Sequence, residues 1–176
     1  MDNPGSKFAF KSMVLLFKVR DFFLPRKNVL QEAGIKPGFR VLDYGCGPGG
    51  YINTTAELVG KSGKIYALDI NPMAIQKVKD VALKKNLSNL ETILSDCATG
   101  LPVRSIDAVL CYDVFHGLKE PEPILKELHR VLKTNGILSF SDHHLKEGEI
   151  ISSVTKSGLF KLSAKGKKTY RFQKQE

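Results

Sequence analysis

Five short apolar runs, separated by stretches with helical periodicity, most strongly limit what this chain can fold into. They begin at residue 39, are rich in Val, Ile and Leu, and read FRVLDY, KIYALDI, LETILSD, IDAVLCYD and GILSFSDH. Helical spacing of apolar residues occurs near 50–59, 72–86 and 121–133. Strands that alternate with helices form parallel sheets covered on both faces. The pattern therefore predicts an α/β fold with a doubly wound, mostly parallel sheet.

The last part of the chain departs from this alternation. GLFKLSAKGKKTYRFQ reads as two short strands around a turn rich in Lys and Gly at about residues 165–168. Such a hairpin would complete the sheet with an antiparallel strand. The hydrophilic stretch 144–150 is predicted to be a loop or the start of a helix.

A segment near the N-terminus needs an apolar partner. Residues 8–24, FAFKSMVLLFKVRDFFL, hold five of the ten phenylalanines, with basic residues interspersed. We expect a helix that packs on the domain; the alternatives are a lid over an apolar substrate pocket or a patch on a membrane surface. Because 176 residues fit one ordinary domain, the predicted division is a helical lid or cap at 1–27 and one domain at 28–176.

Basic charge is concentrated at the two ends of the chain, whose net charge is +9. Residues 1–40 carry eight Lys or Arg and three Asp or Glu, and residues 156–176 carry seven and one. The mildly acidic centre argues against nucleic acid bound across it. The basic ends could still steer an anionic ligand or touch an anionic membrane surface.

Three cysteines, Cys46, Cys97 and Cys111, stand apart without C-x-x-C spacing. Neither a disulfide framework nor a metal site is indicated, and we expect reduced, partly buried thiols. The apolar run MVLLF is far shorter than the roughly 20 residues that span a bilayer, and no small-residue cleavage site follows it. A cytoplasmic protein is therefore the expectation.

The stretch VLDYGCGPGG allows two counts of its glycines. Counted as G-x-G-x-x-G through Gly45, Gly47 and Gly50, it is the fingerprint of a dinucleotide-binding turn. Counted as D-x-G-x-G-x-G, it begins at Asp43, ends at Gly49 and indicates a different ligand.

Each of the first four predicted strands ends in a carboxylate. These are Asp43, Asp69, Asp96 and Asp113. Ligands of an open parallel sheet bind beyond the carboxyl ends of its strands, so we expect all four near one rim. A pyrophosphate on the turn would lie against Asp43, where each like-charge contact at about 5 Å costs about 3 kcal/mol. The loop has no Lys or Arg to compensate, so a ligand with a sulfonium and an ammonium, and without phosphate, fits better.

In order and spacing, these residues resemble the class I methyltransferases that use S-adenosylmethionine. VLDYGCGPGG looks like that family's first motif, IYALDI its second-strand acidic motif, SDC its third-strand motif and IDAVLCYDVFH its fourth-strand motif. LKELHRVLKTNGILSFSDH is similar to the small-molecule branch that includes the ubiquinone and menaquinone methyltransferases. The resemblance implies a Rossmann-like, seven-stranded fold over residues 28–176, with S-adenosyl-L-methionine as cofactor.

The resemblance also implies a role for each residue of the first two motifs. Gly45, Gly47 and Gly49 would let the backbone approach the methionine part of the cofactor, where a Cβ would clash. Asp43 would orient this loop and face the cationic end of the cofactor. Asp69 would accept hydrogen bonds from both ribose hydroxyls.

The remaining motifs would contact the adenine and close the site. Ile70 would lie against the adenine face. Asp96 would accept a hydrogen bond from the exocyclic amine, and the backbone of Cys97 would donate to the ring. Asp113 would close the site beside the sulfonium.

Methyl transfer from a sulfonium is an in-line displacement, so the protein mainly aligns and desolvates the reactants and, where the acceptor must lose a proton, supplies a base. His116, just after the fourth predicted strand, ranks first as that base, and His143, at the end of the fifth, ranks second. Each has an alternative as a hydrogen-bonded structural residue.

The class of acceptor is narrowed by what the chain lacks. The position after the fourth strand reads DVFH, without the D/N-P-P-Y/F motif of many enzymes that methylate the amines of nucleic-acid bases. A short connection to the final hairpin leaves little material for a substrate domain, so a compact, apolar or amphiphilic small molecule is favoured. Two alternatives stay open: an RNA or protein methyltransferase docking through the basic ends, and a nicotinamide-dependent oxidoreductase.

Overall fold

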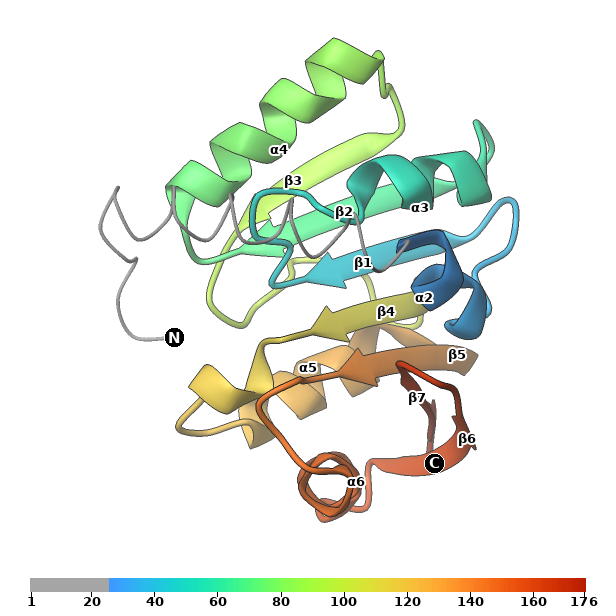
Figure 1. Cartoon of the computed structure of the whole chain (residues 1–176), viewed down its shortest axis with the longest axis vertical. Helices are drawn as coiled ribbons and strands as arrows, with labels where there is room; N and C mark the ends of the chain where they lie inside the picture. The colour runs from blue at the N-terminus through green and yellow to red at the C-terminus, as the bar shows by residue number, and fades with distance from the viewer. Residues whose placement is uncertain (1–25) are drawn as a thin grey trace.

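A seven-stranded sheet forms the centre of the computed structural model, which describes residues 26–176 (Figure 1). Its strands lie in the order β3-β2-β1-β4-β5-β7-β6. They are β1 (Arg40–Tyr44), β2 (Lys64–Asp69), β3 (Leu90–Leu94), β4 (Ile106–Tyr112), β5 (Leu132–Ser141), β6 (Phe160–Lys165) and β7 (Tyr170–Lys174). Strands β1 to β5 are parallel, and β7 pairs antiparallel with both β5 and β6. This confirms the predicted doubly wound, mostly parallel sheet with a C-terminal hairpin.

Helices cover both faces of this sheet (Figure 1). One face carries α2 (Arg26–Glu32), α3 (Ile52–Val59) and α4 (Pro72–Lys85). The other carries α5 (Glu122–Val131) and α6 (Glu147–Thr155). A short 3-10 helix, η1 (Phe115–Gly117), follows β4.

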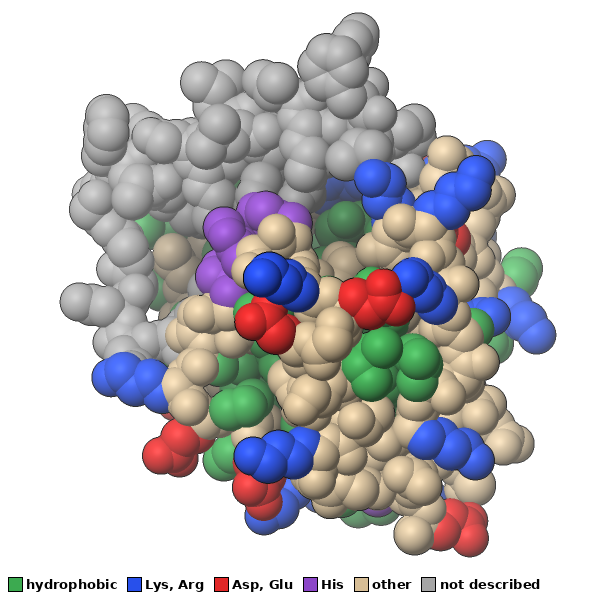
Figure 2. Space-filling view, turned by 60° about the horizontal axis from the view of Figure 1, so that its bottom comes forward, with side chains coloured by type: hydrophobic (Ala, Val, Ile, Leu, Met, Phe, Trp, Pro, Cys, Tyr) green, Lys and Arg blue, Asp and Glu red, His purple; other side chains and the backbone are tan. Residues whose placement is uncertain are grey.

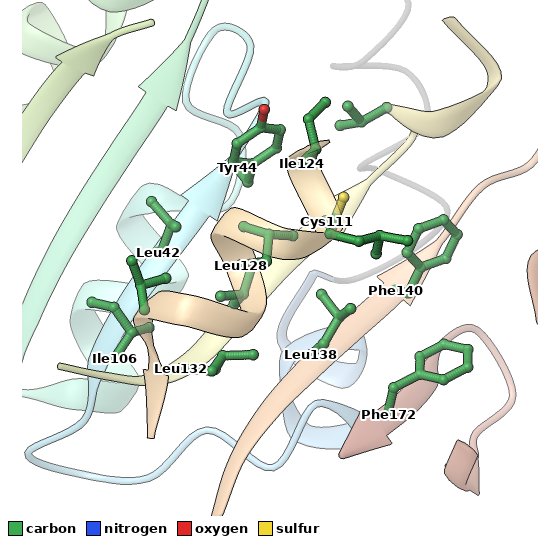
Figure 3. Packing of buried hydrophobic residues seen from close by; sticks show 14 of the residues in the cluster. Leu42, Tyr44, Ile106, Cys111, Ile124, Leu128, Leu132, Leu138, Phe140 and Phe172 are labelled. Atoms are coloured by element: carbon green, nitrogen blue, oxygen red, sulfur yellow. The ribbon is translucent and has the colours of Figure 1, made fainter. Parts of the chain in front are cut away.

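Two apolar cores lie on opposite faces of the sheet because successive side chains of a strand point to opposite sides. In β1, Val41 packs among the residues of α2, α3 and α4, whereas Leu42 and Tyr44 pack with α5 and α6. Figure 3 shows Leu42 with Leu128 of α5 and Phe140 of β5 in this second core. By the same alternation, Asp43 shares the face of Val41.

The boundary between α5 and β5 differs from the prediction. The expected helix 121–133 ends at Val131, and β5 begins at Leu132 instead of at Gly136, where the predicted run GILSFSDH starts. Leu132 is fully buried and pairs with Ile106, so burial of this leucine in the sheet ends the helix without a glycine. The next pair joins Ala108 to Ile137, so residues 133–136 form an irregularity in the strand.

Helix α6 follows the stretch that was predicted to be a loop or the start of a helix. Its first turn is acidic, which suits a helix N-terminus. The Glu149 side chain accepts a hydrogen bond from the backbone N–H of Lys146 at 2.7 Å. Ile150 and Val154, four residues apart, bury the inner face of the helix.

The predicted lid at residues 8–24 lies outside the described residues, and its predicted boundary between residues 27 and 28 falls inside α2. Within the described part of the chain, no helix is both long and apolar enough to cross a bilayer.

Candidate active site

The loop between β1 and α3 has a backbone that only glycine adopts readily. Gly45, Gly47 and Gly49 have φ values of +73°, +52° and +81°, in the region that side chains disfavour. A Cβ on Gly45 would lie 2.5 Å from Cγ2 of Val114, and one on Gly49 would lie 3.0 Å from Cγ2 of Val78. Conformation therefore favours glycine at all three positions, and packing adds to it at Gly45 and Gly49.

Gly50, the last glycine of the alternative count, lies against a side chain from α2. Its φ is not positive, but a Cβ there would overlap the guanidinium of Arg26. That guanidinium lies 4.7 Å from the centre of the Tyr51 ring. Arg26 was not among the predicted site residues, because nothing in its spacing indicates that α2 places it on the glycine loop.

Asp69, at the end of β2, ties the glycine loop to the start of α4. Its Oδ2 accepts a hydrogen bond from the backbone N–H of Gly47, and its Oδ1 accepts one from Asn71, both at 2.8 Å. Asp69 is only 5% exposed. Burial raises the pKa of its carboxyl group, while these backbone donors oppose the rise.

Asp43 is the buried carboxylate behind the loop, and it is 4% exposed. Its Oδ2 has no hydrogen-bond partner among the described residues. Burial raises the pKa of this carboxyl group to about 7; the nearby Arg26 lowers it and Asp69 raises it further. Because a buried acceptor without a donor is unfavourable, this oxygen provides a place for a donor group, and a cationic donor fits best.

The third predicted motif lies at the rim beyond β3. Asp96 is exposed, and its backbone carbonyl accepts a hydrogen bond from the Tyr44 hydroxyl at 2.7 Å, which joins the ends of β1 and β3. The backbone N–H of Cys97 donates to Oγ of Ser95 at 3.3 Å. Ile70 is half-buried directly after β2. These side chains surround the same rim as the glycine loop.

Two Asp–His pairs lie side by side at the ends of β4 and β5. Oδ1 of Asp113 lies 2.7 Å from Nδ1 of His143 and also accepts the backbone N–H of that histidine. Oδ2 of Asp142 lies 3.0 Å from Nδ1 of His116 and accepts its backbone N–H. The ring of His144 lies between the two pairs, with centroids 4.1 Å from His116 and 3.9 Å from His143. Figure 2 shows histidine side chains gathered in one place on this face.

Asp142 was not among the predicted site residues, although FSDHH places it directly before two histidines. Its side chain is fully buried. Burial acts to raise the pKa of the carboxyl group, but hydrogen bonds from His116 and from the backbone of His144 outweigh burial and lower it. Asp142 is thus an anion that holds His116 in place.

The two histidines differ in what they face. His143, with a side chain 62% exposed, lines a cavity of about 450 Å³ together with Asp113. His116, with a side chain 35% exposed, is not part of that lining. The cavity continues to Tyr51 and to the turn of the β6–β7 hairpin, residues 165–168. Of the two base candidates, the second-ranked His143 therefore lines this cavity, and the first-ranked His116 does not.

The same residues include a group with the spacing of metal ligands. One side-chain atom each from Asp113, Asp142 and His143 lies within 4.8 Å of the others. Carboxylate oxygens and imidazole nitrogens suit divalent cations, and the same three residues take part in the Asp–His hydrogen bonds described above.

Known proteins are similar to this chain over most of its length. The sequence model of the methyltransferase domain family matches residues 35–175. Aklanonic acid methyltransferase from a Streptomyces species is 30% identical over 131 residues, which cover 73% of this chain and 59% of that protein. Demethylmenaquinone methyltransferase from Geobacillus stearothermophilus is 29% identical over 113 residues, covering 64% and 48%. The chain thus spans about half to three fifths of the length of these curated relatives.

A solved structure agrees with these relatives. The crystal structure of a SAM dependent methyltransferase from Aquifex aeolicus superposes with a TM-score of 0.75 and 26% sequence identity, covering 85% of this chain and 88% of that one. The family match covers the glycine loop, the strand ends and both Asp–His pairs. This chain therefore belongs to the methyltransferase domain family.

Proposed function

We propose that this chain is an S-adenosyl-L-methionine-dependent methyltransferase that acts on a small, apolar or amphiphilic molecule. The observation that carries the proposal is the buried Oδ2 of Asp43, which has no partner among the described residues and lies behind a glycine backbone with no room for a Cβ at Gly45. Membership of the methyltransferase domain family supports it.

The residues around the loop suit the parts of this cofactor. When bound, it supplies a methyl group on a sulfonium, ready for in-line displacement by a nucleophile of the acceptor. Asp43 would hold the ammonium group, and the guanidinium of Arg26, which lies against the loop at Gly50, would hold the carboxylate. Asp69 would accept from the ribose hydroxyls with the lone pairs that its backbone donors leave free.

The exposed end of the site would hold the adenine. Ile70 would provide an apolar surface for one ring face. Asp96, with its side chain exposed at the rim, would accept from the exocyclic amine. The N–H of Cys97 would exchange its 3.3 Å bond to Ser95 for one to the ring, and Asp113 would close the site next to the sulfonium.

His143 is the base that we propose for acceptors that must lose a proton. The carboxylate of Asp113 holds the proton of the imidazole on Nδ1, so Nε2 can accept a proton from a group in the cavity. His116 is paired with Asp142 in the same way, but it does not line this cavity. It would support the His143 ring through His144.

Calorimetric titration with S-adenosylmethionine and its demethylated product tests the cofactor assignment. Both should bind, and Asp69→Ala should weaken binding by about 100-fold, because two hydrogen bonds to a charged group are lost. Asp80→Ala, at an exposed position of α4, is the matched control and should leave affinity unchanged. The proposal is wrong if neither compound binds, and titration with a nicotinamide dinucleotide then tests the remaining alternative.

A further inference from the structure

The cavity beside His143 is uneven in charge. At the ends of β4 and β5 it is lined by the carboxylates of Asp113 and Asp142, each already bonded to a histidine. Its cationic groups are Arg26, which we assign to the cofactor, and three lysines, one at the end of β6 and two in the turn that follows it, within residues 165–168. Val29, Leu145 and Ile150 add apolar surface.

The backbone of this turn is held in place by helix α2. Oε2 of Glu32 accepts hydrogen bonds from the backbone N–H of Lys168 at 2.8 Å and of Thr169 at 3.1 Å. It also accepts the Thr169 hydroxyl at 3.3 Å. A Cβ on Gly166 would meet the Glu32 carboxylate, which would have to shift from its present position on the turn. The turn therefore presents its side chains from a fixed backbone, which reduces the entropy lost when they bind a ligand.

Two of the three lysines are available to an anion. Lys165 is engaged, because its Nζ lies 2.6 Å from Oε2 of Glu147. Lys167 and Lys168 are exposed, and neither ammonium group forms an ion pair with a described residue. A preordered turn that carries two adjacent unpaired cations at a cavity attracts a negatively charged group.

We propose that the acceptor of the methyl group, taken as a substrate of the proposed methyltransferase, is an amphiphilic acid whose carboxylate is bound by Lys167 and Lys168. Its apolar body lies against Val29 and Ile150, and its reacting atom lies at His143. The carboxylates near His143 repel an anion while the lysine turn attracts it, and Arg26 is assigned to the cofactor, so the charges favour this orientation. The cavity of about 450 Å³ falls in the ~300–1,000 Å³ range of small-molecule pockets.

The test compares an acid with its uncharged isostere. Biphenyl-4-carboxylate and biphenyl-4-carboxamide are titrated separately into the full chain, with the demethylated cofactor present. The wild type should bind the carboxylate about tenfold more tightly than the amide, as expected for charge-assisted hydrogen bonds. Lys167→Ala with Lys168→Ala should reduce the ratio to near one, and the corresponding double Arg variant should restore it.

Lys84→Ala with Lys85→Ala is the matched control. These lysines are exposed in the last turn of α4, on the β3 side of the sheet and away from the hairpin, and their loss changes the net charge equally (Figure 1). Equal affinity of the wild type for the two probes would overturn the proposal. So would an equal loss of selectivity in the α4 control, since that would indicate only a long-range field.

A membrane surface is the other source of anionic groups. Binding to phosphatidylglycerol vesicles, with phosphatidylcholine vesicles as reference, tests whether the two lysines bind a membrane instead of the acceptor. The acceptor site would be refuted if the Lys167 and Lys168 variant lost vesicle binding while its ratio of carboxylate to amide affinity stayed unchanged. Failure of the proposed function is recognised separately. It appears as absence of cofactor binding by the wild type, whereas the acid selectivity can be measured with or without cofactor.

Discussion

Replacing Gly45 by alanine tests whether the glycine loop is held by sterics. The added Cβ would lie 2.5 Å from Cγ2 of Val114 while the backbone holds φ at +73°. The left-handed conformation costs about 1 kcal/mol, and forcing a methyl group into a packed site costs a further ~1–3 kcal/mol. We therefore expect the free energy of unfolding to fall by roughly 2–4 kcal/mol.

A second glycine separates these two contributions. Gly158 has nearly the same φ, +74°, but an added Cβ would meet nothing within 4 Å, so Gly158→Ala should show the conformational cost alone. Urea denaturation measures both variants, and calorimetry should show weaker cofactor binding only for Gly45→Ala. In a Val114→Ala background the cost of Gly45→Ala should shrink towards that of Gly158→Ala. Equal destabilisation by the two single variants would refute the steric argument.

Three further outcomes follow from the site. Burial raises the pKa of Asp43 to about 7 from 3.8, so between these pH values the folded state holds a proton that the unfolded chain releases. The free energy of unfolding, measured by urea denaturation, should therefore fall as pH rises through this window, by up to ~4 kcal/mol. Asp43→Asn should remove this pH dependence. Glu32→Ala should cost about 1–3 kcal/mol and speed hydrogen exchange at Thr169, since its N–H loses its acceptor; Glu57→Ala, exposed on α3, should do neither. His143→Asn should lower the rate of methylation of an acceptor that must lose a proton by at least about 100-fold, while cofactor affinity is kept. An unchanged rate would exclude this base.

Local sequence patterns predicted the sheet and the glycine loop because both depend on residues that are close together in the sequence. Runs such as KIYALDI carry the period and residue types of buried strands, and the five expected strands are all present. The positive φ of Gly45, Gly47 and Gly49 likewise follows from residue type, since glycine alone adopts this conformation readily. Asp43 and Asp69 meet at the loop because parallel strands end at one edge.

Contacts between segments that are far apart in the sequence could not be predicted from local patterns. Arg26 reaches Gly50 through the packing of α2, and Asp142 holds His116 across 26 residues. The predicted end of α5 was wrong because burial of Leu132 against β4, and not a glycine, terminates the helix.

The sequence by itself therefore determined the fold class, the methyltransferase resemblance and the residues that line the glycine loop, because these depend on period, residue type and spacing along the chain. Only the tertiary structure decided which histidine lines the cavity between β4, β5 and the hairpin turn, and which charged groups surround that cavity. Those properties arise when the ends of β4 and β5 meet a hairpin turn that Glu32, 136 residues before Lys168, holds in place. No local pattern encodes a contact of that length, since its energy comes from groups that become neighbours only in the folded chain.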